Sequence, residues 1–104
     1  MAWFYLTLAG ILEVVWAYAM KQSAGFTRLT PSLITLVSMA GSFWLLAIAM
    51  RTIPLGTAYP IWTGIGAVGA FLVGIFLLGE AITLLRVAAV VLVISGLILL
   101  KLAS

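Results

Sequence analysis

The sequence has 104 residues, of which 66% are hydrophobic and only 7% are charged. A water-soluble domain of this composition would have too little polar surface to face the solvent, so the sequence predicts an integral membrane protein embedded in the lipid bilayer. It contains no cysteine and no histidine, which excludes disulfides and removes the usual zinc ligands and the usual acid–base side chain near neutral pH. We therefore expect no enzyme, no metal and no cofactor. The net charge of +3 comes from basic residues at segment ends, which favours topology anchors over a nucleic-acid partner.

The first apolar segment, residues 2–20, carries a glutamate near its middle. As a helix it would be roughly 28 Å long, which matches a hydrocarbon core of about 30 Å. A charge at that depth costs on the order of 2.5 to 3.5 kcal/mol. Glu13 is therefore expected to face a protein interior, keep a proton or hold a cation, and the simpler alternative is a protonated structural carboxyl.

Three further apolar segments follow, at about 31–50, 57–78 and 84–100. Pro31 suits the first turn of the second helix, where its missing N–H is not needed. Thr57 is the expected cap of the third helix, which would place Pro60 in its first turn. The sequence predicts an all-α integral membrane protein, with residues 1–104 forming one domain of four transmembrane helices.

Basic residues are balanced between the two faces of this arrangement. The expected distribution is Lys21, Arg28 and Arg86 on one face, and Arg51, Lys101 and the terminal amine on the other. Because Lys and Arg near span ends set orientation, neither orientation is strongly favoured and both are expected in the membrane. Four helices can hardly enclose a cavity that shields a carboxyl and admits a solute, so we expect an antiparallel homodimer.

Helical spacing indicates which side chains could share such a cavity. Residues three or four apart lie on one face, and three such faces carry polar, aromatic or small side chains: Gly10, Glu13, Trp16 or Ala17, and Met20; Thr35, Ser38 and Ser42; Tyr59, Trp62 or Thr63, and Gly66. The hydroxyls have an alternative, because intramembrane serines commonly bond their own helix backbone. Ser42 is therefore either a cavity residue or a purely local one.

The chemistry of these faces suits a cation. A carboxylate supplies the counter-charge, and each aromatic face supplies cation–π attraction of roughly 0.5 to 2 kcal/mol. Apolar surroundings disfavour the charged form of a carboxyl, so Glu13 can hold a proton until a cation displaces it. This alternation predicts proton-coupled exchange.

Small residues recur along the third segment. The positions 66, 70 and 74 form a stripe that suits close helix packing, and Gly64, Gly66 and Gly69 are also candidates for a hinge that alternating access would use. The fourth segment has no ionisable residue before Lys101, so it is expected to be a packing or dimer helix.

Several motifs together resemble the small multidrug resistance family, over nearly the whole chain. They are Gly10-Ile-Leu-Glu13-Val-Val-Trp16, Gly25-Phe-Thr-Arg28-Leu-Thr-Pro31, Pro54-Leu-Gly-Thr-Ala-Tyr59 and Ile61-Trp62-Thr-Gly64-Ile-Gly66. The loop and tryptophan motifs look like the guanidinium-exporter subtype. One position departs from the family pattern, since Pro60 stands where a small residue is usual.

The resemblance implies an antiparallel dimer in the inner (plasma) membrane that exchanges guanidinium or another small organic cation for protons. It further implies Glu13 as the shared proton and substrate site, with the surrounding side chains being Trp16, Ser42, Tyr59 and Trp62. Two other functions stay open: an exporter of quaternary ammonium or hydrophobic cations, and a non-transporting membrane assembly or channel subunit. A paralogous chain in place of one half of the dimer also stays open.

Overall fold

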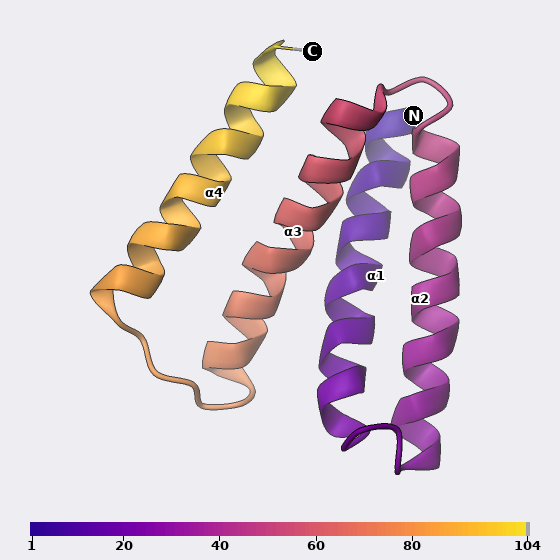
Figure 1. Cartoon of the computed structure of the whole chain (residues 1–104), viewed down its shortest axis with the longest axis vertical. Coiled ribbons are helices and arrows are strands. Elements are labelled where there is room, and N and C mark those ends of the chain that lie inside the picture. Colours follow the sequence, from indigo (N-terminus) through magenta and orange to yellow (C-terminus); the bar gives the residue numbers. More distant parts are fainter. Residues whose placement is uncertain (104) are drawn as a thin grey trace.

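The computed structural model describes residues 1–103 and contains four α-helices joined by short loops (Figure 1). Their bounds are α1 Ala2–Gln22, α2 Leu29–Ala49, α3 Leu55–Phe76 and α4 Leu84–Ala103. Each helix is long and apolar enough to cross a membrane. The prediction of an all-helical chain with four candidate spans is therefore confirmed.

The start of α3 differs from the prediction. The helix begins at Leu55, because the carbonyl of Pro54 accepts hydrogen bonds from the backbone N–H groups of Thr57 and Ala58 at 3.0 and 2.9 Å. Thr57 is therefore already inside the helix and does not cap it. Pro60 consequently lies in the second turn, where it removes one backbone hydrogen bond, and the expectation of a first-turn proline is wrong here.

Most other boundaries shift by one to three residues, the largest shift being at the end of α4. α1 continues to Gln22, since the N–H of Ser23 still donates to the carbonyl of Ala19 at 2.9 Å. α2 begins at Leu29, so Pro31 does fall in its first turn. α3 ends at Phe76, before a loop in which Gly79 has a φ of +68° that glycine adopts easily.

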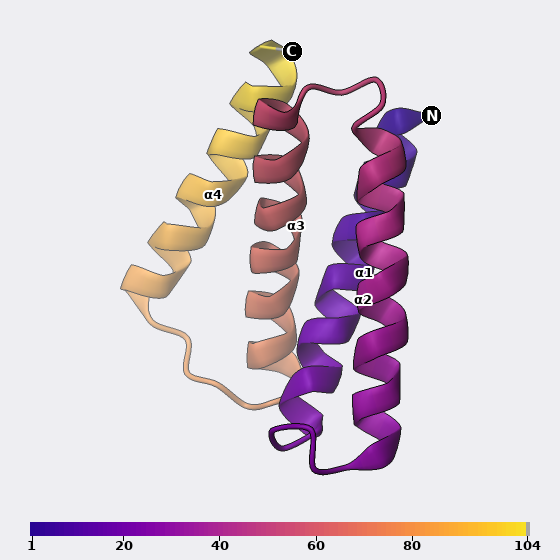
Figure 2. The ribbon, with the colours of Figure 1, turned by 45° about the vertical axis from the view of Figure 1, so that its right-hand side comes forward.

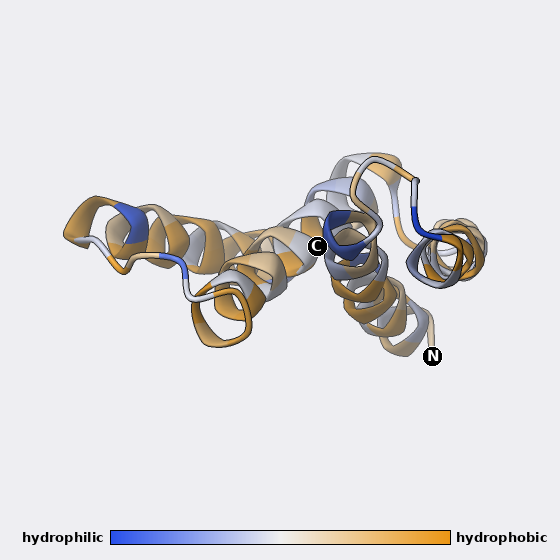
Figure 3. Cartoon of the chain, turned by 90° about the horizontal axis from the view of Figure 1, so that it is seen from below, coloured by the Kyte–Doolittle hydropathy of each residue, from blue (hydrophilic) through white to orange (hydrophobic). Residues whose placement is uncertain are grey.

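The first three helices form a packed unit, and α4 stands apart from it. α1 packs against both α2 and α3, whereas the backbone of α4 approaches only α3 (Figures 1 and 2). The buried core lies towards the α2–α3 loop and consists of Leu6, Ala9, Leu46, Ala49, Ile53, Ala58, Ile61 and Trp62. None of residues Leu84–Ala103 is buried. Many large apolar residues are exposed, as expected for surfaces that face lipid. Figure 3 shows that hydrophobic residues occur along all four helices.

Glycines set the close approach of α1 and α3. A Cβ placed on Gly10 would lie 2.7 Å from the Cβ of Ile65, and one on Gly69 would overlap the Val14 side chain. A Cβ on Gly66 would overlap the carboxyl group of Glu13. Gly66 of the predicted stripe, together with Gly10 and Gly69, thus serves helix packing, which brings α3 directly against the face of α1 that carries Glu13.

An ion pair closes the loop between α3 and α4. Arg86 Nη2 lies 3.1 Å from Glu80 Oε1, and the Arg86 guanidinium lies over the Phe71 ring, 5.3 Å from its centroid. Both charged side chains are about 40% exposed, at 39% and 42%. An ion pair this exposed contributes only about 0 to 1 kcal/mol, so it orients the loop more than it holds α4.

We expect Gly10→Ala to lower the free energy of unfolding by about 1 to 3 kcal/mol, because the added methyl group collides with a branched side chain that has little room to move. Gly56→Ala is the matched control. No atom lies within 4 Å of the position of its Cβ, so this variant should be neutral or more stable by up to about 1 kcal/mol. Unfolding in sodium dodecyl sulfate, followed by circular dichroism, measures both. Equal effects would contradict the packing role of Gly10.

Candidate functional site

Ser42 joins three helices through its hydroxyl group. Its Oγ donates to the carbonyl of Ala9 on α1 at 2.6 Å and accepts from Nε1 of Trp62 on α3 at 3.0 Å. Both bonds are buried, and the Ser42 side chain has no exposed area. The local alternative for this serine is therefore wrong, since its hydrogen bonds run between helices and not back to α2. Thr35 behaves in the local way, because its hydroxyl donates to the carbonyl of Pro31 in the same helix at 2.8 Å.

The Glu13 side chain contacts α3 one helical turn from the hydrogen bonds of Ser42. Ala9 precedes Glu13 by four residues on α1, and Trp62 precedes Gly66 by four residues on α3, so each pair shares a face. The contact of Glu13 with Gly66 therefore lies directly beside the Ser42–Trp62 hydrogen bond. The structure places three of the predicted site residues, on three different helices, within adjacent turns.

Four aromatic rings form a continuous row beside Glu13 and the Ser42 hydrogen bonds. Phe43 links Trp16, at a centroid distance of 6.4 Å, to Trp62 at 5.6 Å, and Trp62 in turn contacts Tyr59 at 5.6 Å. Tyr59 and Phe43 are half exposed, at 52% and 47%. The row thus begins beside Glu13 and ends at the outer surface of the protomer.

Phe43 was missed by the reasoning from sequence. It follows Ser42 directly and so falls about 100° away from the polar face that helical spacing predicts for α2. The sequence does contain a signal for Phe43. An aromatic residue this far inside a span is too deep to be an interfacial anchor, so it is expected to contact other side chains. Its long side chain reaches the two tryptophans despite the angle.

Two buried polar atoms of the site have no hydrogen-bond partner within residues 1–103. They are Oε1 of Glu13 and Nε1 of Trp16, on consecutive turns of α1. Buried polar groups in proteins are almost always hydrogen-bonded, and the exceptions are often functional. The open carboxylate oxygen, with an aromatic row beside it, is suited to a small cation whose N–H groups can donate to that oxygen.

The predicted hinge glycines all lie at packed positions. Gly66 and Gly69 lie against Glu13 and Val14, and a Cβ on Gly64 would lie 2.5 Å from Leu97 Cδ2 on α4. α3 runs through all three without interruption, from Leu55 to Phe76. Packing explains these glycines in the conformation seen here, and the hinge stays a prediction.

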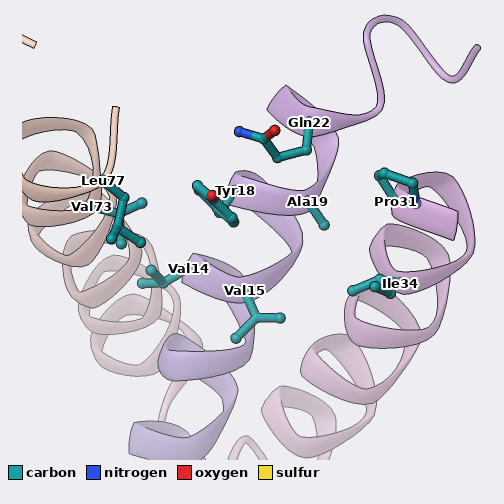
Figure 4. A pocket seen from close by; sticks show the side chains of 9 residues that line it. All are labelled: Val14, Val15, Tyr18, Ala19, Gln22, Pro31, Ile34, Val73 and Leu77. Carbon is teal, nitrogen blue, oxygen red and sulfur yellow. The ribbon is translucent and has the colours of Figure 1, made fainter. Parts of the chain in front are cut away.

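The cavities of the single chain do not enclose the site. One cavity of about 510 Å³ opens between α1, α2 and α3 towards the α1–α2 loop (Figure 4). Its nearly apolar lining consists of Val14, Val15, Tyr18, Ala19, Gln22, Pro31, Ile34, Val73 and Leu77. A cavity of about 580 Å³ between α3 and α4 includes Tyr59 but not Glu13. Neither of these two cavities therefore contains both the Glu13 carboxyl and Tyr59.

Four helices long enough to span a membrane, with a mid-helix glutamate that has one buried carboxylate oxygen, define a small multi-pass membrane protein. Residues 1–93 match the family described as Small Multidrug Resistance protein, and the chain belongs to this family. It is 59% identical, over the full length of both chains, to a guanidinium exporter of Yersinia pseudotuberculosis. It is 54% identical to guanidinium exporters of Citrobacter freundii and Escherichia coli, over all of this chain and 99% of each relative. The family and the four apolar helices make it a multi-pass protein of the inner membrane.

We expect Ser42→Ala to lower the free energy of unfolding by about 1 to 3 kcal/mol, because the Trp62 N–H would stay buried without an acceptor. Ser95→Ala removes an exposed hydroxyl that bonds only to the Val91 carbonyl of its own helix, and its effect should stay within about 0.5 kcal/mol. Detergent unfolding followed by tryptophan fluorescence compares the two. A Ser42→Ala protein as stable as the Ser95→Ala control would show that the junction of three helices contributes little.

Proposed function

We propose that this protein exports guanidinium ion in exchange for protons, with Glu13 as the site that both occupy in turn. Full-length relatives that are 54% to 59% identical carry the name guanidinium exporter. On this proposal the protein is a transporter and not an enzyme, since the cation crosses the membrane unchanged.

The observation that carries the proposal is the buried carboxylate oxygen of Glu13 without a hydrogen-bond partner among residues 1–103. Guanidinium is planar, and its parallel N–H groups fit a carboxylate with two hydrogen bonds. Its flat face can stack on an indole, and Trp16 lies one turn away on the same helix face. Ser42 and Trp62 are already bonded to each other, so they support the site by holding the three helices in register.

Proton coupling follows from the low polarity around the carboxyl. A neutral, protonated Glu13 offers no counter-charge, and an ionised Glu13 in apolar surroundings needs a cation beside it. Proton and guanidinium therefore exclude each other. Guanidinium should bind more tightly as the pH rises, because the competing proton is then lost, and more weakly as the pH falls.

An antiparallel homodimer would complete the site. Tyr59 and Phe43 are exposed in the single chain, none of residues Leu84–Ala103 is buried, and the cavities are open. A second copy in the opposite orientation would add its own Glu13 and cover these surfaces. The balanced basic residues of the two faces allow both orientations. Gly64, Gly66 and Gly69 are the positions where we propose that α3 bends as the dimer alternates its access.

We expect guanidinium to release protons from the detergent-solubilised protein in weakly buffered solution, and Glu13→Gln to abolish this release. Glu80→Gln is the matched control, since it removes the only other acidic side chain, which lies in an exposed ion pair away from the site. Tetramethylammonium has no N–H donors and leaves carboxylate acceptors unpaired, a cost of about 1 to 3 kcal/mol. It should therefore need concentrations that are about 5- to 150-fold higher.

The same titration, together with a current measurement in liposomes, separates the competing functions. An equal or stronger response to tetramethylammonium would favour an exporter of quaternary ammonium or hydrophobic cations. Current through the protein in liposomes, without proton movement in the opposite direction, would favour a channel. If Glu13→Gln releases as many protons as the unaltered chain, Glu13 is not the proton-binding site.

The antiparallel dimer has its own test. Adding two lysines to the α2–α3 loop should fix one orientation and reduce transport, and adding two to the α1–α2 loop should fix the other. Co-expression of the two versions should restore transport, because each supplies the orientation that the other lacks. Full transport by one version alone would exclude an obligatory antiparallel arrangement.

A further inference from the structure

Two neighbouring cavities form one groove along the second half of α1. The cavity of about 510 Å³ shown in Figure 4 shares Val14, Tyr18 and Val73 with a cavity of about 170 Å³ between α1, α3 and the α3–α4 loop. We call the two together the α1 groove. Its larger part is nearly apolar, and its smaller part is lined by Lys21 and Glu80 as well. The α1 groove therefore combines a long apolar surface with a charged end.

The apolar part of this groove lies on the opposite side of α1 from the cation site. Gln22 lines the groove and is rotated by about 180° from Glu13 around the axis of α1, at about 100° per residue. On α2, Ser42 bonds to α1, and Ile34 of the groove lies about 80° to one side of it, whereas Phe43 of the aromatic row lies about 100° to the other. A second copy that covers Glu13 and the aromatic row would therefore leave the groove facing lipid.

The charged end of the groove offers both a cation and a carboxylate. The Glu80 carboxyl lies against Gly74, and its Oε1 accepts one hydrogen bond from Arg86 Nη2 at 3.1 Å. A carboxylate can accept about four, so Glu80 has room for further N–H groups. Lys21, in the last turn of α1, supplies N–H donors and a positive charge. Glu80 is the carboxylate that counts here, because Glu13 is in the middle of α1 and α4, with the end of the chain, lies at the opposite end of the molecule (Figure 1).

We propose that the α1 groove binds a zwitterionic phospholipid with a primary ammonium group, that is, phosphatidylethanolamine. The phosphate lies beside Lys21, the ammonium beside Glu80, and one acyl chain in the apolar part of the groove. Both charged residues are at the ends of spans, which is the headgroup level of a bilayer. Phosphatidylcholine brings the same phosphate, but its quaternary ammonium has no N–H for the carboxylate, and phosphatidylglycerol has no ammonium at all. This binding does not depend on which cation the protein transports.

Quenching of tryptophan fluorescence by phospholipids with brominated acyl chains tests the proposal. Ile34→Trp places an indole on the apolar wall, and the difference from the unaltered chain isolates its signal. The bilayers are phosphatidylcholine with small fractions of one brominated lipid, in about 0.5 M salt so that long-range attraction of anionic lipid is screened. We expect brominated phosphatidylethanolamine to quench this indole at about two- to fivefold lower mole fraction than brominated phosphatidylcholine or phosphatidylglycerol, the strength of one exposed ion pair. Val37→Trp is the matched reporter, since Val37 is 72% exposed and outside the groove, and the ethanolamine and choline lipids should quench it equally.

Two variants in the Ile34→Trp background separate the charged contacts. Glu80→Gln should remove the preference for the ethanolamine over the choline lipid, and Lys21→Gln should weaken quenching by all three lipids, because each of them carries the phosphate. Arg51→Gln is the matched control, since it removes one charge in the α2–α3 loop, at the opposite end of the spans. Either variant behaving like this control would overturn the proposal. So would equal quenching by the ethanolamine and choline lipids, strongest quenching by phosphatidylglycerol, or an indole that no lipid quenches because a second copy covers the groove.

Discussion

The contact between the Glu13 carboxyl and Gly66 is the constraint on which the rest of the structure depends. A carboxyl in the middle of a span must lie against protein, and here it lies against the one residue type that has no side chain of its own. The same absence of side chains at Gly10 and Gly69 lets the α1 and α3 backbones approach each other above and below this point. The site is thus a product of the packing between α1 and α3 and not an addition to it.

The second helix contributes by bonding to this pair through a single hydroxyl group. Ser42 fixes the position of α2 along its axis relative to Ala9 on α1 and Trp62 on α3, because its two hydrogen bonds need a definite geometry. In lipid the hydrophobic effect gives no register between helices, so a buried hydrogen bond of this kind specifies it. The orientation of the Trp62 indole, and with it the aromatic row from Trp16 to Tyr59, follows from this junction.

Much of this arrangement could be predicted from the sequence, and the limits have physical causes. Hydropathy and length gave four spans because the bilayer allows few alternatives to helices. The place of Ser42 followed from spacing, but its bonding partners did not, since a serine can bond its own helix equally well. Phe43 was not predicted because helical spacing gives the direction in which a side chain leaves the helix and not how far a long side chain extends. The start of α3 was misplaced because threonine is a preferred cap, whereas here the carbonyl of Pro54 begins the helix.

The isolation of α4 has a consequence for how the chain is made. Residues 1–76 already contain every member of the buried core, so this part can pack as soon as its three helices have entered the membrane. α4 arrives last, and its backbone approaches only α3, while a few of its side chains reach the core and Trp3 of α1. On the proposed antiparallel dimer, a second copy would supply the remaining contacts of α4, and the yield of this last step would rise with the amount of protein in the membrane. Sequence changes confined to α4 should consequently alter how much mature protein accumulates at low expression, while the packing of the first three helices is unchanged.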